Sequence, residues 1–161
     1  AAAKLNNVTL ENLALSDQRG HGKIVLPADS DGGPSPGARL GREGEDGVEV
    51  ETRTLDEYFA GHSNRPIRFI KCDVEGHELE VFMGGQQILS LDRPTILFEC
   101  EERHREGPVH EVFDYLRSLG YAGWFISPGG MKPIDEFDPS VHQSADSKSD
   151  QYINNFLFEF A

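Results

Sequence analysis

The ten residues from Phe69 to Glu78 constrain the fold more than any other part of the sequence. They belong to a mostly apolar run, Ile67 to Val74, that ends in acidic residues. A short apolar run of this kind is typical of a buried strand, and apolar residues at helical spacing follow it from His77 to Leu91. A strand that turns directly into a helix is the unit from which α/β sheets are built. The sequence therefore predicts an α/β fold.

Further segments with strand and helix patterns alternate along the chain. This alternation favours right-handed crossovers and a mostly parallel sheet. The last two strands have no helical pattern between them, so we expect them to form an antiparallel pair at one edge. The predicted strands are Val8–Ser16, Gly22–Leu26, Val48–Arg53, Ile67–Val74, Thr95–Cys100, Tyr121–Ile126 and Tyr152–Phe160, and the predicted helices start at Thr54, His77 and Pro108.

Residues 27–47 are rich in glycine and proline and almost free of large apolar side chains. This composition predicts a flexible loop, either a variable surface loop or a mobile flap over a substrate site. Residues 131–150 are polar and are expected to be irregular. We find no internal repeat, so residues 1–161 are expected to form one domain.

The formal net charge of −13 argues against nucleic acid and anionic membranes as partners, because both would be repelled. No apolar run approaches the roughly 20 residues that a membrane helix needs. Cys72 and Cys100 lie in apolar stretches without a metal-binding or redox spacing, so we expect two reduced core cysteines. These features predict a cytoplasmic protein.

Acidic side chains follow the predicted strand that ends near Val74, where ligands bind in open α/β sheets. Glu75 and Glu78 would also be favoured there by the dipole of the following helix, without any catalytic role. Asp73 lies inside the strand and is the stronger candidate for a general base. Lys71 precedes it, and His77 lies in the turn.

A second polar cluster follows the predicted strand Thr95–Cys100 and contains Glu99, Glu101, Glu102 and His104. We expect these two strands to be adjacent, so the two clusters should lie close together. Converging carboxylates and histidines can act as bases, hold a polar substrate or bind a metal. No fixed metal-ligand spacing is present, so we expect no metal site.

The chain resembles the FkbM family of methyltransferases over nearly its whole length and in the family's order. The most specific match is the K-x-D-V-E-G-x-E pattern that begins at Lys71. The matching segments are Asn12–Asp17 with Gly20, Val50–Asp56, Phe69–Glu78, Arg93–Glu99 and Tyr152–Phe158.

This resemblance implies a Rossmann-like class I methyltransferase fold and transfer of a methyl group from S-adenosylmethionine to an oxygen. The acceptor would be a small hydroxylated molecule, a sugar or a secondary metabolite. Positioning supplies much of the acceleration of such a displacement. For this reaction we expect Asp73, Glu75 and Glu99 to be catalytic and Lys71, His77, Glu101 and His104 to bind substrate.

The resemblance also implies that Ala14, Leu15, Ser16 and Asp17 bind the cofactor by flanking its adenine. The family's first strand with its glycine-rich turn, and the acid-ended second strand, have no counterpart in the sequence. We therefore expect a partial methyltransferase domain, incomplete at its N-terminus and lacking the cofactor's glycine loop.

Two other functions remain open from the sequence. One is a catalytically inactive methyltransferase-like module that serves as a scaffold or binds a partner protein. A glycine-rich turn encoded upstream of Ala1 would favour the enzyme over this module. The other is a metal-dependent hydrolase, whose activity would be lost with a chelator and would not require S-adenosylmethionine.

We predict that the 161-residue chain by itself binds S-adenosylmethionine weakly or not at all, because the glycine loop of the family is missing. Isothermal titration calorimetry checks this prediction. Binding with a dissociation constant in the micromolar range would contradict it.

Overall fold

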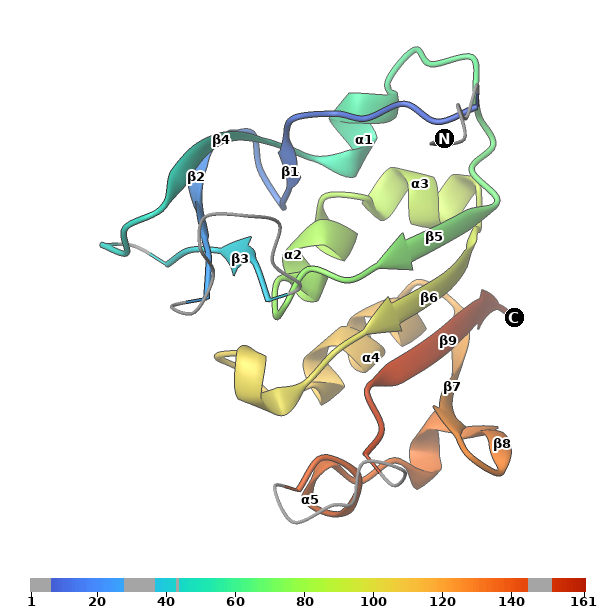
Figure 1. Cartoon of the computed structure of the whole chain (residues 1–161). Helices are drawn as coiled ribbons and strands as arrows, with labels where there is room; N and C mark the ends of the chain where they lie inside the picture. Colours follow the sequence, from blue (N-terminus) through green and yellow to red (C-terminus); the bar gives the residue numbers. More distant parts are fainter. Residues whose placement is uncertain (1–6, 28–36, 43, 145–151) are drawn as a thin grey trace, which may run out of the picture.

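The smaller of two sheets has the strand order β1-β4-β2-β3 (Figure 1). The structure is a computed structural model and describes residues 7–27, 37–42, 44–144 and 152–161. β1 runs parallel to β4, whereas β2 runs antiparallel to both of its neighbours. The strands of this sheet are Ala14–Leu15 (β1), Gly20–Val25 (β2), Arg39–Leu40 (β3) and Val48–Arg53 (β4).

The larger sheet has the order β5-β6-β9-β7-β8 and crosses the middle of the molecule in Figure 1. β5 and β6 are parallel, and the other neighbouring pairs are antiparallel. Its strands are Phe69–Cys72 (β5), Thr95–Glu99 (β6), Tyr121–Ser127 (β7), Gly130–Pro133 (β8) and Asn155–Phe160 (β9).

The predicted α/β class is confirmed, but the prediction of a mostly parallel sheet is wrong. Among the described strands, only the pairs β1–β4 and β5–β6 are parallel. A parallel pair needs a crossover, and the described residues between β2 and β4 contain no helix; the neighbouring strands β2, β3 and β4 pair antiparallel. The antiparallel pairing of β7 with β9 is confirmed, although β9 lies between β6 and β7 rather than at an edge.

The helices are short, and local sequence explains where they begin and end. Thr54 caps α1, since its hydroxyl accepts from the Glu57 amide at 3.0 Å. The predicted helix from His77 to Leu91 is two helices, separated at Gly84 and Gly85. The helices are Leu55–Phe59 (α1), Glu78–Met83 (α2), Gln86–Leu91 (α3), His110–Ser118 (α4) and Pro139–His142 (α5), with 3-10 turns at Glu102–His104 (η1) and Ile134–Glu136 (η2).

Gly84 is required because α2 ends against β1. A Cβ atom at this position would lie 2.1 Å from the carbonyl oxygen of Ser16. The glycine pair therefore lies where the helix is interrupted, and Gly84 lets the end of α2 approach the backbone that follows β1.

Two segments have more structure than the sequence predicted. Residues 39–40, inside the predicted loop 27–47, form β3, whereas residues 28–36 and 43 of that loop lie outside the described residues. The segment 131–144, expected to be irregular, contains most of β8, η2 and α5. Conversely, the strand predicted over residues 8–16 is limited to β1.

Phe98 on β6 is at the centre of an aromatic core. Its ring centroid lies 5.3 Å from that of Phe82 on α2 and 5.5 and 5.6 Å from those of Phe156 and Phe158 on β9. Phe113 packs α4 against the same strands. Such offset and edge contacts stabilise a core beyond the area they bury. This core fixes the ends of β5 and β6, where the polar clusters begin.

Cys72 and Cys100 are free and buried, as predicted. None of the helices in the described part of the chain is long and apolar enough to cross a membrane. Among the described strands β5 pairs only with β6, and its first residue, Phe69, is 54% exposed.

We predict that Phe98→Ala lowers the free energy of unfolding by about 3–5 kcal/mol, because it leaves a cavity that four aromatic neighbours cannot fill. Urea unfolding followed by circular dichroism measures the loss. Phe69→Ala is the matched control and should cost about 1 kcal/mol or less, since half of this ring is already in water. Equal losses for the two variants would contradict the packing described above.

Candidate functional site

The two acidic clusters meet at the carboxyl ends of β5 and β6, as expected from the sequence. The strands are parallel, and Cys72 is level with Phe98, so both chains leave the sheet at the same edge. The residues that follow enclose a small hollow of about 10 Å³. Its lining consists of Asp73, Glu75, Gly76, Glu78, Glu99, Cys100, Glu101 and His104.

A tight turn at Glu75 and Gly76 presents the first cluster. Glu75 has a φ of 53° and Gly76 a φ of 100°, both in the left-handed region. A Cβ atom on Gly76 would lie 2.2 Å from the carbonyl oxygen of His104, so only glycine allows the turn to contact the end of η1. Left-handed backbone at a residue such as Glu75 costs about 1–3 kcal/mol and is concentrated at functional sites.

Glu75 and His104 form the closest contact between the clusters. The distance from Glu75 Oε2 to His104 Nδ1 is 2.6 Å. Two lone pairs would repel at that distance, so the contact requires one proton between the two atoms; with that proton on Nδ1, Nε2 is left for another partner. Burial raises the pKa of Glu75 above its ordinary value, although the charge of His104 opposes the shift. The pair therefore resembles an imidazole base held by a carboxylate.

Lys71 holds the exposed acids of the two strands side by side. Its Nζ lies 3.5 Å from Asp73 Oδ2 and 3.4 Å from Glu99 Oε1. Asn154, which precedes β9, donates to Glu99 Oε2 at 3.2 Å. The lysine thus offsets two neighbouring negative charges, while the side chains of Asp73 and Glu99 remain 47% and 35% exposed.

Glu101 differs from these acids because it is buried and fully engaged. It accepts a hydrogen bond from the Tyr152 hydroxyl, and Arg103 Nε lies 2.8 Å from its Oε2 atom. Burial alone would raise the pKa of Glu101, but the bonds from Tyr152 and Arg103 outweigh it, and the pKa lies below its ordinary value. Glu101, predicted to bind substrate, is thus held by Tyr152 and Arg103 in the lining of the hollow.

His77, also predicted to bind substrate, joins the two sheets. Its Nε2 lies 2.9 Å from the Ser16 hydroxyl after β1, and its Nδ1 lies 3.6 Å from Glu80 Oε2. Both ring nitrogens thus face protein groups. The imidazole also lines the larger cavity beside the hollow, and both of its nitrogen atoms face other side chains of the protein.

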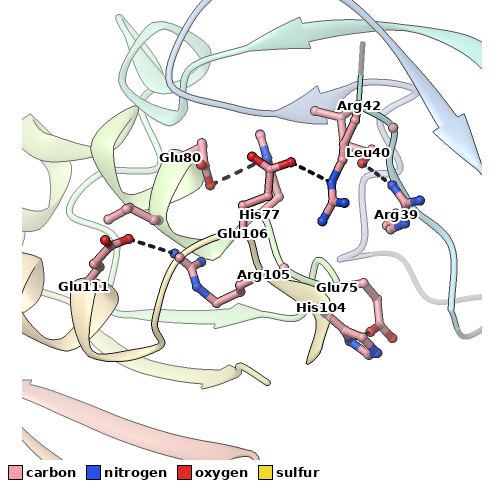
Figure 2. A pocket seen from close by; sticks show the side chains of 14 residues that line it. Arg39, Leu40, Arg42, Glu75, His77, Glu80, His104, Arg105, Glu106 and Glu111 are labelled. Carbon is pink, nitrogen blue, oxygen red and sulfur yellow. Dashed lines mark hydrogen bonds and ion pairs between the residues drawn. The ribbon is translucent and has the colours of Figure 1, made fainter. Parts of the chain in front are cut away.

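A cavity of about 730 Å³ lies beside the acidic hollow, between β3 and the start of α2 (Figure 2). Figure 2 shows Glu75 and His104 together on one side of it and Arg105 next to Glu111. Ion pairs neutralise the arginines of β3 and its continuation: Arg39 with Glu45 at 2.7 Å and Arg42 with Glu106 at 2.9 Å. We call this space the main cavity; its lining is Arg39, Leu40, Gly41, Arg42, Glu75, Gly76, His77, Leu79, Glu80, His104, Arg105, Glu106, Gly107 and Glu111.

Sequence reasoning missed the arginines of the main cavity. Arg39 and Arg42 lie in the segment predicted to be a flexible loop, which gave no reason to place them at a site. Arg105 directly follows His104, but one arginine in a polar stretch carries no signal of its own. Its side chain is only 4% exposed, and that burial is visible only in the structure.

The family model that matches the chain is the methyltransferase FkbM domain, over residues 2–122. The matched region covers most of the chain and contains β1 to β6, η1 and α4. The chain belongs to the FkbM methyltransferase family. The expected family is thus confirmed, and the strand ends described above are those of an FkbM domain.

A solved structure, the methyltransferase FkbM from Methylobacillus flagellatus KT, has a similar fold. Its TM-score is 0.53 at 15% sequence identity, and the match covers 93% of this chain and 28% of that one. The chain therefore spans little more than a quarter of the length of that methyltransferase. A comparison with curated proteins finds no match.

The residues expected to flank adenine do not form one surface. Ser16 is 6% exposed and bound to His77, whereas Asp17 is exposed. Leu15 lines a separate hollow of about 510 Å³ with Tyr58 and Phe59. The described residues thus do not by themselves fit S-adenosylmethionine, and weak binding by this chain remains a prediction. The same residues hold no group of three or more His, Cys, Asp or Glu side chains that could bind a metal ion.

We predict that Glu101→Gln lowers the free energy of unfolding by about 2 kcal/mol at neutral pH, because charged hydrogen bonds are lost. A carboxylate with a lowered folded pKa stabilises the fold above its unfolded pKa, and this contribution disappears as the pH falls through the folded value. The difference between wild type and variant should therefore vanish in acid.

Urea unfolding at a series of pH values measures this difference. Glu106→Gln is the matched control, because its carboxylate is 77% exposed and its pair with Arg42 is screened by water. If the loss of unfolding free energy in Glu101→Gln does not change with pH, the lowered pKa of Glu101 in the folded protein is contradicted.

Proposed function

We propose that the complete protein acts as an S-adenosylmethionine-dependent O-methyltransferase on a hydroxyl group of a sugar or secondary metabolite, whereas the 161-residue chain by itself, which we predict to bind the cofactor weakly or not at all, is inactive. Membership of the FkbM methyltransferase family supports the reaction class. The Glu75–His104 contact at the wall of the main cavity is the observation that supports a hydroxyl acceptor. An alcohol is a weak nucleophile, so its oxygen needs a base to accept its proton as the methyl group arrives.

His104 is the proposed base. The carboxylate of Glu75 fixes a proton on Nδ1, so the Nε2 lone pair can accept the proton of the acceptor hydroxyl. Among the described residues, no hydrogen bond or ion pair is formed by Nε2. The carboxylate then stabilises the imidazolium that forms, as a carboxylate does beside other catalytic histidines.

Asp73 and Glu99 are proposed to orient the acceptor. Lys71 holds them together at the rim of the hollow, within the same group of residues as His104. Carboxylates can accept hydrogen bonds from sugar hydroxyls and so select one oxygen for the base. This assigns Asp73, expected from the sequence to be the base, to orientation.

The cavity and the charge of the chain favour a neutral or weakly charged small molecule. The main cavity is lined by both arginine and glutamate side chains, and ion pairs with Glu45 and Glu106 neutralise Arg39 and Arg42. The net charge of −13 supports the exclusion of nucleic acid and anionic membranes as partners. Two buried free thiols, Cys72 and Cys100, fit a reducing compartment, and we propose a cytoplasmic location.

We predict that His104→Gln in the intact protein lowers kcat by about 10²- to 10⁴-fold, because the proton acceptor is removed. Asp73→Asn should lower kcat/KM by at least ~10²-fold through poor orientation of the acceptor. The measurement is transfer of a radiolabelled methyl group from S-adenosylmethionine to a panel of hydroxylated acceptors.

His110→Gln is the matched control, since this exposed histidine on α4 packs on Phe113 and lies outside the residues of the site. Near-normal turnover of His104→Gln would exclude His104 as the base. A wild-type protein that transfers no methyl group to any acceptor would instead favour the inactive scaffold.

A further inference from the structure

Glu78 and Arg105 form an ion pair that is almost completely removed from water. Their side chains are 1% and 4% exposed, and Glu78 Oε2 lies 3.6 Å from Arg105 Nη1. Desolvation of two charges is so costly that apolar side chains at such positions are often equally or more stable. Stability alone therefore does not explain why two charged residues occupy this place beneath the site.

Each member of the buried pair is attached to one half of the Glu75–His104 contact. Glu78 Oε1 accepts a hydrogen bond of 2.9 Å from the Gly76 amide and so fixes the turn that carries Glu75. Arg105 follows His104 directly and closes η1, with its amide bonded to the Glu102 carbonyl at 3.2 Å. The pair thus joins the same two segments that Glu75 and His104 join.

The buried pair is also incompletely hydrogen-bonded. Within the described chain, Glu78 Oε2 and Arg105 Nε and Nη1 have no hydrogen-bond partner, although all three atoms are buried. Leaving such buried groups unpaired destabilises the fold. Catalytic contacts that are long in a free protein commonly shorten when substrate binds. A few tenths of an ångström would turn the 3.6 Å approach into a hydrogen bond.

We propose that the buried Glu78–Arg105 pair is a positioning device for the site. It holds the Glu75 turn against the end of η1, so that Glu75 meets His104 Nδ1 and Nε2 faces the acceptor. The inference rests on the proposed role of His104 as base. Glu78 and Arg105 are positioning residues, since they act through Glu75 and His104 and not on the reacting atoms.

We predict that Glu78→Gln in the intact protein lowers kcat by about 10- to 100-fold while KM changes less than about 3-fold, because orientation is lost and the cavity wall is kept. The glutamine oxygen can still accept from the Gly76 amide, so the variant removes the charge of the pair and little else. Arg105→Lys retains the charge without the planar guanidinium, and it should lose less kcat than Glu78→Gln.

A second measurement does not depend on activity. Nitrogen-15 NMR of the imidazole rings reports which ring nitrogen carries the proton, and His104→Gln identifies the signal of His104 in the 161-residue chain. We expect the Nδ1–H form in the wild type and a mixture with the Nε2–H form in Glu78→Gln. Arg117→Lys is the control, because its pair with Asp114 lies on the surface of α4.

The two measurements separate the possible failures. A single Nδ1–H form in both Glu78→Gln and Arg105→Lys would overturn the positioning role, whatever happens to kcat. A changed tautomer with unchanged kcat would support positioning and exclude His104 as the base. Thermal unfolding of each variant shows whether it is folded, and Arg105→Lys decides the question if Glu78→Gln does not fold.

Discussion

The contact between the backbone of Gly76 and the carbonyl of His104 is the constraint on which the site depends. No side chain fits between them, since a Cβ atom would lie 2.2 Å from the oxygen. Because the turn after β5 touches the end of η1 directly, residues almost thirty positions apart in sequence share one small hollow. Everything proposed for Glu75, His104 and the buried pair follows from this approach.

The acidic side chains around the hollow lie close together, and each has at least one partner that offsets its negative charge. The carboxylates are compensated by several different partners. Lys71 is shared between Asp73 and Glu99, Arg103 and Tyr152 hold Glu101, and Glu78 has Arg105. Among the described acids that line the hollow, Glu75 is the one whose carboxylate contacts an imidazole, that of His104. That difference singles out the Glu75–His104 contact as the reactive one.

The sequence was sufficient to predict the strands and helices whose own residues carry a clear apolar pattern or a clear start. Val48–Arg53 forms the predicted strand without a shift, and a helix begins after Thr54 as predicted. The meeting of the two acidic clusters was also predictable, because it needs only two adjacent parallel strands. The order of the strands in the sheet was not predictable. The sequence of Asn155–Phe160 predicts a strand but does not show whether this strand lies at an edge or between β6 and β7. Arg105 was missed for the same reason, as burial of a charge depends on distant neighbours.

The central place of β9 has a consequence for how the domain forms during protein synthesis. β6 and β7 are made before β9, but each has an edge that pairs with residues 155–160. Until these residues leave the ribosome, the large sheet is split into two halves and Phe98 lacks two of its aromatic neighbours. Folding of this domain is therefore completed after translation of its last strand and does not proceed from the N-terminus onward. A chain cut short by a handful of residues would keep the acidic motif in its sequence and lose the sheet that supports it.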